Sequence, residues 1–288
     1  MAYVLLLRSS QDVPDRYEVA FKTRGFHPTS IPVLETVHVN LDGLRNIVRA
    51  GGRESGFDGV IITSARACEA WREVVKDTSS EGEGWQRIPF YVVGEATANA
   101  LSDISQVAAD QNLVPRDIRG GSTSGNSEKL AHFILEDQGL SLKNDSEISE
   151  ARKFRMLYLT GDKNRDTLPN ILGTRGVELL NLQVYETQGS STFEADLTDY
   201  LKGKKPKWII YFAPSAAAFV TPVLRKYLML PDSSDYNSSS DLLAHIAAIG
   251  PTTSIYLVET LNLRVDVVAP KPTPDALAEA IVSFDTTV

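Results

Sequence analysis

The chain has 288 residues, a formal net charge of −8, 42% hydrophobic and 23% charged residues, and a single cysteine, Cys68. These values are typical of a globular protein of about two domains, and they exclude fibrous chains, disordered chains and internal disulfides. The acidic balance argues against nucleic acid as a partner, because phosphate binding needs clustered Lys and Arg. No apolar run approaches the ~20 residues of a membrane helix, and a lone cysteine fits a reducing compartment, so we expect no membrane association and a cytoplasmic location.

The chain begins with a buried-strand pattern, from Tyr3 to Leu7, that is too short for a secretion signal and has no basic region before it. Further apolar runs of strand length each precede a turn rich in Ser, Thr, Gly or Pro and then a stretch of helix length; they lie at 60–62, 92–93, 155–159, 209–211 and 248–249. This alternation predicts parallel sheets covered by helices on both faces, with the turns at the carboxyl ends of the strands. Binding sites of such sheets lie at those ends.

Three polar segments interrupt the alternation, at 77–83, 143–151 and 231–241. All are rich in Ser, Asp or Gly, which is typical of surface insertions. We expect weak order in these segments and no catalytic role for them.

The two halves of the sequence resemble each other. Residues 24–36 resemble 175–187 at a constant offset, and the matches continue in order through 60–67 with 209–216, 92–97 with 248–253, and 122–126 with 271–275. Since all α/β units look broadly alike, a single match would mean little. One ordered series along both halves indicates an internal duplication, and therefore two related lobes.

Common motifs of catalysis and cofactor binding are absent from the sequence. It has no G-x-G-x-x-G after a strand, no phosphate-binding loop and no G-x-S-x-G. Cys68 lies on a predicted helix beside Ala67, where a small core residue is the better interpretation than a nucleophile. The sequence therefore has no fingerprint of a nucleotide cofactor. The histidines are scattered and make no metal-ligand spacing; they are His27, His38, His132 and His245.

Hydroxyl-bearing residues gather in the turns that follow the predicted strands. Each alone is explained as a helix N-cap, for which Ser and Thr are preferred. Together they place several helix N-termini on one rim of each lobe, and such termini attract carboxylates. We expect these rims to bind a polyanion despite the negative net charge; the residues are Thr63, Ser64, Thr97, 122–126, Ser215, Thr252 and Thr253.

Tyr185 is the candidate for proton transfer near the junction of the two halves. A tyrosine near a strand end usually packs its ring and leaves its hydroxyl in water. Its counterpart in the first half is Leu34, so the fold alone does not require tyrosine at this position. The asymmetry favours a functional role.

Taken together, these segments resemble the uroporphyrinogen-III synthase family over nearly the whole chain. Each matching piece is short, and the specificity of the resemblance lies in their joint order and spacing. The polar insertions are similar to those of eukaryotic, for example fungal, members. The matching pieces are 5–8, 63–67, 93–97, 123–130, 161–169, 184–187, 213–215, 249–253 and 272–277.

The resemblance implies an α/β fold of two lobes, each a flavodoxin-like parallel sheet flanked by helices, joined by two extended linkers. The lobes are expected to be discontinuous, with 1–36 and 190–288 forming lobe one and 37–189 forming lobe two. The Glu35-Thr36 and Glu186-Thr187 pairs would then be the two crossovers. The active site is expected in the cleft between the lobes.

The resemblance also implies an enzyme, a cyclising lyase of haem biosynthesis. Its substrate, linear hydroxymethylbilane, loses water, and the last pyrrole ring is inverted as the macrocycle closes to uroporphyrinogen III, without cofactor or metal. Tyr185 matches the tyrosine proposed to protonate the departing hydroxyl. The implied substrate-binding residues are Thr63, Ser64, Arg66, Gly94, Thr97, Ser124, Gly125, Asn126, Ser215, Thr252 and Thr253. We expect a monomer, because no apolar stripe in the sequence demands a partner.

Two positions depart from the family pattern: Ala65, where proline is frequent, and Ala213, where serine is frequent. Any role for a hydroxyl at 213 is thereby lost. Two other functions remain open, a non-catalytic two-lobed binding protein for a small polycarboxylate and a transferase for nucleotide-activated substrates. The lack of an export signal counts against the first, and the lack of a phosphate loop or metal-binding carboxylate pair counts against the second.

Overall fold

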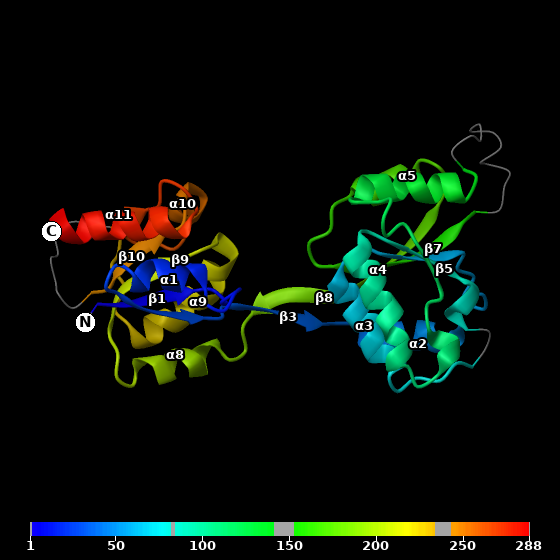
Figure 1. The fold of residues 1–288 in the computed structure, drawn as a ribbon, viewed down its shortest axis with the longest axis horizontal. Helices are drawn as coiled ribbons and strands as arrows, with labels where there is room; N and C mark the ends of the chain where they lie inside the picture. The colour runs from blue at the N-terminus through cyan, green and yellow to red at the C-terminus, as the bar shows by residue number, and fades with distance from the viewer. Residues whose placement is uncertain (1, 82–83, 141–152, 234–242, 288) are drawn as a thin grey trace. The chain divides into compact units, whose positions relative to one another are not determined.

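The computed structural model describes residues 2–81, 84–140, 153–233 and 243–287 (Figure 1). Of the segments predicted to be weakly ordered insertions, 143–151 lies outside the described residues, as do 82–83 and 234–241. The chain forms two compact units: unit 1 comprises Met1–Glu35 and Thr187–Val288, and unit 2 comprises Thr36–Glu186. Each unit is a sheet with helices on both faces, so the predicted α/β class is confirmed.

Unit 1 is built on a five-stranded sheet in the order β11-β10-β9-β1-β2, and its strands pair in parallel. Helices α8, α9 and α10 pack on one face, and α1 and α11 pack on the other. The strands are β1 (Tyr3–Leu7), β2 (His27–Ile31), β9 (Pro206–Tyr211), β10 (His245–Ala248) and β11 (Val267–Val268). The helices are α1 (Arg16–Lys22), α8 (Phe193–Leu201), α9 (Pro214–Tyr227), α10 (Pro251–Glu259) and α11 (Pro274–Thr287).

Unit 2 is built on a six-stranded sheet in the order β3-β8-β7-β4-β5-β6. Helices α2, α3 and α4 pack on one face, and α5 and α7 pack on the other. The strands are β3 (Leu34–His38), β4 (Gly59–Ile62), β5 (Pro89–Val92), β6 (Asp117–Arg119), β7 (Arg155–Gly161) and β8 (Glu178–Gly189). The helices are α2 (Leu41–Ala50), α3 (Ala65–Val75), α4 (Glu95–Ser102), α5 (Ser127–Asp137) and α7 (Thr167–Gly173), with short 3₁₀ turns η1 (Trp85–Arg87), η2 (Asp103–Gln106) and η3 (Gln111–Leu113).

The central strands are apolar on both faces because helices cover both. In β1, Leu5 and Leu7 enter one cluster of unit 1, whereas Val4 and Leu6 enter the other. Successive side chains of a strand point to opposite faces, so a strand between two helix layers reads as a continuous apolar run. This is why the strands are visible in the sequence as uninterrupted runs rather than as alternating patterns.

Strands β3 and β8 carry the chain out of unit 1 and back. They are neighbours in the sheet of unit 2, where the Val39 N–H donates to the Val184 carbonyl at 3.0 Å. In unit 1, the Ser190 N–H donates to the Val33 carbonyl at 3.0 Å, so the two strands run in opposite directions. On its other side, β8 pairs in parallel with β7, and β7 pairs in parallel with β4. β3 is therefore the antiparallel strand at the edge of a sheet that is otherwise parallel.

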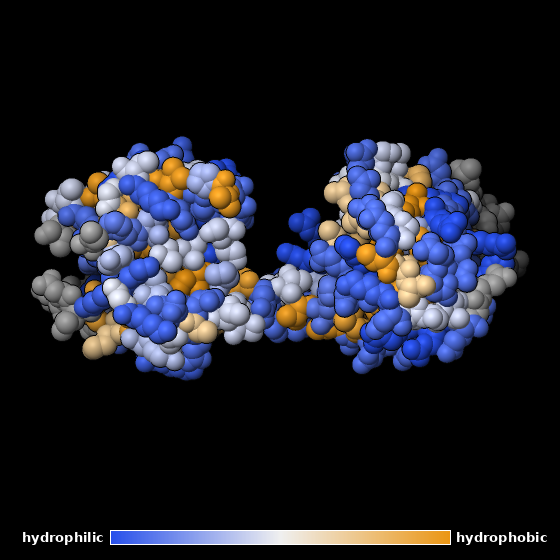
Figure 2. Space-filling view, turned by 60° about the horizontal axis from the view of Figure 1, so that its bottom comes forward, coloured by the Kyte–Doolittle hydropathy of each residue, from blue (hydrophilic) through white to orange (hydrophobic). Residues whose placement is uncertain are grey.

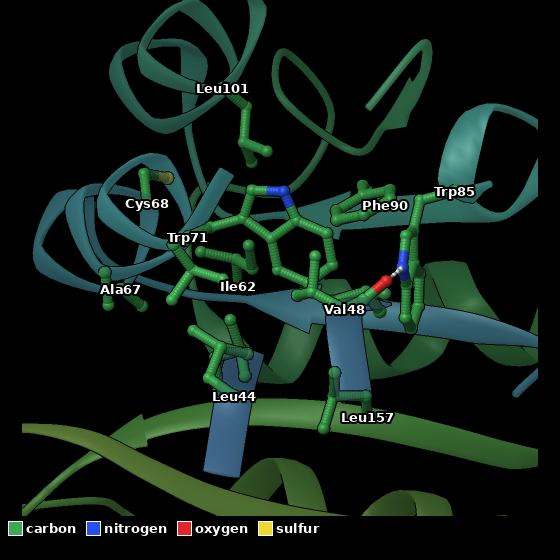
Figure 3. Packing of buried hydrophobic residues seen from close by; sticks show 14 of the residues in the cluster. Leu44, Val48, Ile62, Ala67, Cys68, Trp71, Trp85, Phe90, Leu101 and Leu157 are labelled. Atoms are coloured by element: carbon green, nitrogen blue, oxygen red, sulfur yellow. Dashed lines mark hydrogen bonds between the residues drawn. The ribbon is translucent and has the colours of Figure 1, made fainter. Parts of the chain in front are cut away.

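An aromatic cluster fills the core of unit 2 on the side of α3 (Figure 3). The ring of Trp71 meets those of Trp85 and Phe90 edge-on, with centroids 5.1 and 5.0 Å apart. Both indole N–H groups are satisfied: Trp85 donates to the Val48 carbonyl at 2.9 Å and Trp71 to the Leu113 carbonyl at 3.4 Å. The cluster thus ties α2, α3, η1, β5 and η3 together.

The surface of each unit is mostly hydrophilic in the view of Figure 2, with hydrophobic residues scattered over it. The most exposed large hydrophobic side chains, Val13, Met229 and Ile255, belong to three separate segments. Within the described residues, no helix combines the length and the apolar character needed to cross a membrane.

The Trp71 ring should be a principal source of stability for unit 2. Changing Trp71→Ala removes a fully buried ring and leaves a cavity, so we expect the free energy of unfolding to fall by about 3–5 kcal/mol. Its exposed neighbour provides the control, since Arg72→Ala should change that free energy by no more than about 0.5 kcal/mol. Urea unfolding followed by far-ultraviolet circular dichroism measures both; equal effects would contradict the assigned packing.

Candidate active site

The predicted site residues of unit 2 lie where parallel strands end and helices begin. Thr63 and Ser64 follow β4, and Gly94 follows β5 and precedes α4. These strands are parallel neighbours, so their carboxyl ends meet at one edge of the sheet. Helix N-termini and polar side chains meet at such an edge, whereas the buried parts of the strands hold mainly apolar side chains.

Tyr185 is hydrogen-bonded to the N-cap residue of α3 at this edge. The Ser64 hydroxyl donates a hydrogen bond to Tyr185 Oη at 3.2 Å and accepts one from the Ala67 N–H at 3.3 Å, which caps α3. The guanidinium carbon of Arg66 lies 5.9 Å from the centroid of the Tyr185 ring. The structure therefore brings Tyr185 next to Ser64 and Arg66, although 121 residues separate Tyr185 from Ser64 in the sequence.

A β-bulge turns Tyr185 toward α3. Thr160 of β7 pairs with Gln183, but the next residue, Gly161, pairs with Tyr185, so Val184 is the extra residue. Regular alternation would place Val184 and Tyr185 on opposite faces, yet both pack against the core cluster beneath α3. Bulges commonly redirect a side chain beside an active site, and this one redirects the only proton donor predicted here.

Sequence reasoning missed Tyr158, a second tyrosine close to the site. Burial raises the pKa of Tyr158, a hydrogen bond with Thr63 opposes the rise, and the neighbouring Tyr185 adds to it. A polar-tipped side chain within the otherwise aliphatic run of β7 was the available indication.

The turn between β5 and α4, which contains Gly94, is hydrogen-bonded to the segment that precedes α5. Gly94 has a φ of +79°, which suits glycine, and its N–H donates to the Ser124 carbonyl at 3.1 Å. No side chain caps α4, whose first turn contains the buried Thr97. The first-turn N–H groups of α4 therefore donate no hydrogen bond to a capping side chain.

Ser124 and Asn126 are engaged within the fold. Ser124 is fully buried, and its hydroxyl donates to the carbonyls of Val92, at 3.0 Å, and Gly120. The Asn126 side chain accepts from the Lys129 N–H at 2.9 Å and so caps α5. Gly125, between them, is exposed. The hydroxyl of Ser124 thus holds the turn, whereas Gly125 presents backbone to solvent.

In unit 1, the predicted residues occupy the first turns of α9 and α10. Ser215 and Thr252 are exposed, whereas Thr253 is buried. Neither helix has a side-chain cap, because its N-cap residue is Ala213 or Gly250. The carboxyl edge of this sheet therefore also offers helix starts whose N–H groups have no side-chain acceptor at the cap.

Arg8, at the carboxyl end of β1, is engaged in an internal ion pair. Its guanidinium donates to both carboxylate oxygens of Asp15 at 2.8 Å, and both side chains are largely buried. Burial raises the pKa of Asp15, but hydrogen bonds from the Gln11 N–H, from Arg8 and from the Glu18 N–H outweigh this and hold the pKa below its usual value. The positive charge of Arg8 is thus balanced within unit 1.

The described residues hold no group of three or more His, Cys, Asp or Glu side chains that could bind a metal ion. Cys68 is buried in the core of unit 2, as its helix position suggested. Burial raises the pKa of its thiol to about 12, so the thiol stays protonated near neutral pH and is a poor nucleophile.

Comparison with known proteins settles the family. A family model described as uroporphyrinogen-III synthase HemD matches residues 15–279. The chain belongs to the uroporphyrinogen-III synthase family. Uroporphyrinogen-III synthase of Saccharomyces cerevisiae is 28% identical over 290 residues, covering 96% of this chain and 94% of the yeast protein. That of Schizosaccharomyces pombe is 29% identical over 289 residues, covering 99% and 98%.

Solved structures of the family also align with the chain. Uroporphyrinogen-III synthetase of Helicobacter pylori aligns at 19% identity and a TM-score of 0.44, covering 99% of this chain and 100% of the other. A mutant uroporphyrinogen III synthase of Thermus thermophilus aligns at 16% and 0.41, covering 100% of both. At this similarity the assignment rests on the sequence matches. The predicted enzyme class is confirmed by them, and the alternative of a non-catalytic binding protein finds no support.

The buried hydroxyl of Ser124 should matter for stability and not for substrate affinity. Changing Ser124→Ala removes hydrogen bonds to two buried carbonyls, so the free energy of unfolding should fall by about 1–3 kcal/mol. The KM for hydroxymethylbilane should stay within about twofold, since the main chain of the turn remains. Ser122→Ala, an exposed change in the same turn, is the control. A raised KM at unchanged stability would instead place the Ser124 hydroxyl on the substrate.

Proposed function

We propose that this chain catalyses the family's reaction as a cytoplasmic monomer, converting hydroxymethylbilane to uroporphyrinogen III with loss of water and inversion of the last pyrrole ring. The observation that carries the proposal beyond family membership is the Ser64–Tyr185 hydrogen bond at the carboxyl edge of the sheet of unit 2. It fixes a phenol at the kind of edge where α/β proteins bind their ligands.

Tyr185 is proposed as the general acid. Because Ser64 donates to Tyr185 Oη, the phenol proton is not used in that bond and is available to the substrate. As the C–O bond of the hydroxymethyl group breaks, the phenol proton passes to the departing oxygen, and the hydroxyl leaves as water. The methylene carbon stays on the pyrrole ring as an electrophile, and the phenol is left as a phenolate. The guanidinium of Arg66 lies at cation–π distance from the Tyr185 ring and helps to hold the ring in place.

Helix N-termini are proposed to bind the carboxylates of the substrate. The first turns of α4, α9 and α10 lack side-chain caps, so their N–H groups are open to an anion. In contrast, α3 and α5 are already capped by Ser64 and Asn126. Each carboxylate at an exposed helix start gains about 0.3–1 kcal/mol, so several contacts are needed to hold a flexible bilane.

In and around these helix starts, hydroxyls, main chain and one guanidinium would complete the carboxylate contacts. The proposed contributors are Thr63, Arg66, Gly94, Thr97 and Gly125 of unit 2 and Ser215, Thr252 and Thr253 of unit 1. Much of the rate should come from holding the two ends of the bilane close together, since orienting two reacting groups can lower a barrier by about 7–11 kcal/mol.

The departure at Ala213 fits this mode of binding. Ala213 occupies the N-cap of α9 and has no hydroxyl to satisfy the first-turn N–H groups, while Pro214 keeps the first helical residue in place. A serine there would compete with a substrate carboxylate for the same N–H groups. The lost hydroxyl therefore leaves the helix start more open to an anion.

The proposed reaction is tested by the isomer of the product. Purified protein supplied with hydroxymethylbilane should yield the type III isomer after oxidation and chromatographic separation of the porphyrins. Spontaneous closure without inversion gives the type I isomer, which serves as the internal control. Type I alone, from protein shown by circular dichroism to be folded, would refute the proposed activity.

The role of Tyr185 is tested by Tyr185→Phe. Loss of the donated proton should lower kcat about 10²–10⁴-fold with little change in KM, because the ring still fills its place. Tyr227→Phe is the matched control, since that exposed hydroxyl of unit 1 bonds only Glu194 among the described hydrogen bonds. Full activity of Tyr185→Phe would remove the phenol from the mechanism.

A further inference from the structure

Gly161 ends β7 directly against the ring of Tyr185. A Cβ atom built at Gly161 would lie 2.8 Å from Tyr185 Oη and closer still to Cε2 and Cζ. The three nearest atoms all belong to Tyr185, so its ring is what a side chain at position 161 would meet first. Gly161 is itself buried.

The direction of the missing side chain follows from the strand. Leu157 and Leu159 point into the core cluster beneath α3, and by alternation position 161 faces the same way. The bulge in β8 turns Tyr185 onto that same face, opposite Gly161. The bulge therefore delivers the ring to a position that only a residue without a side chain leaves open.

Backbone conformation does not explain glycine at this position. Gly161 belongs to a β-strand, and it is absent from the glycines with positive φ, which are the positions where other residues are strained. Alanine would therefore suit the strand itself. The cost of a Cβ falls on the far end of the Tyr185 side chain, which can move.

We propose that Gly161 is a positioning residue for the general acid: its lack of a side chain seats the Tyr185 ring so that the phenol meets Ser64 and faces the substrate. The inference rests on the acid role proposed for Tyr185. It adds a requirement for the reaction at a residue that donates no proton and binds no carboxylate.

The test is Gly161→Ala, with Gly43→Ala as the matched control, because a Cβ at Gly43 on α2 would meet nothing within 4 Å. We expect Gly161→Ala to stay folded and to lower kcat roughly 100-fold with little change in KM, since a reacting group has been displaced while the binding groups remain. Gly43→Ala should match the unmodified protein. Loss of folding in Gly161→Ala would overturn the inference, because the strain would then fall on the fold instead of the ring.

A double-mutant cycle separates positioning from a general packing effect. In the Tyr185→Phe background, Gly161→Ala should lower kcat by no more than about twofold further, because the proton it misplaces is already gone. Additive losses would show that Gly161 acts on something other than the phenol and would overturn the inference.

Tyrosine NMR gives a readout independent of turnover. With ¹³C-labelled tyrosine, the ring resonances of Tyr185, assigned by their absence in Tyr185→Phe, should move in Gly161→Ala and stay in place in Gly43→Ala. If Tyr185→Phe is fully active, the acid role fails and this inference fails with it. If Tyr185→Phe is impaired while Gly161→Ala is fully active with unmoved resonances, only the positioning inference fails.

Discussion

In both units, helices cover both faces of a sheet whose central strands are parallel, and this double burial determines where chemistry is possible. A strand between two helix layers has little room for polar side chains, as the apolar runs of β1 and β4 show. Polar and catalytic groups are thereby confined to the carboxyl edge, where strands end and helix N-termini begin. The Ser64–Tyr185 pair, the turn at Gly94 and the open starts of α9 and α10 all occupy such edges.

Not every polar group at these edges is available to a ligand. The Ser124 side chain is hydrogen-bonded to the carbonyl of Val92, and the Asn126 side chain caps α5. Arg8 forms an ion pair with Asp15. Helix starts without side-chain caps remain available to a ligand, because no capping side chain accepts a hydrogen bond from their first-turn N–H groups. For an acidic protein that acts on a polycarboxylate, backbone N–H groups supply attraction without a cluster of Lys and Arg.

Tyr185 depends on two local irregularities acting together. The bulge opposite Thr160 changes the face to which the ring points, and Gly161 leaves the space that the ring then occupies. Ser64 joins this arrangement to the start of α3, so the phenol is held from the helix side as well. A regular β8 would have pointed the ring toward the opposite face, which is covered by α5 and α7.

The sequence by itself determined the class of fold, the family and the positions of the strand-to-helix turns. It could do so because doubly buried strands appear as uninterrupted apolar runs and because turn residues are constrained locally. The unequal pair Leu34 and Tyr185 also made Tyr185 the candidate acid, because a duplicated fold does not by itself require tyrosine at one copy of a position and leucine at the other. Only the tertiary structure distinguished the hydroxyl of Ser64, which bonds Tyr185, from that of Ser124, which holds a turn together. In the sequence, a serine in a turn after a strand looks the same in either role. The tertiary structure alone revealed the bulge and the contact with Gly161, because both depend on the register between β7 and β8, a relation between distant segments that no local pattern encodes.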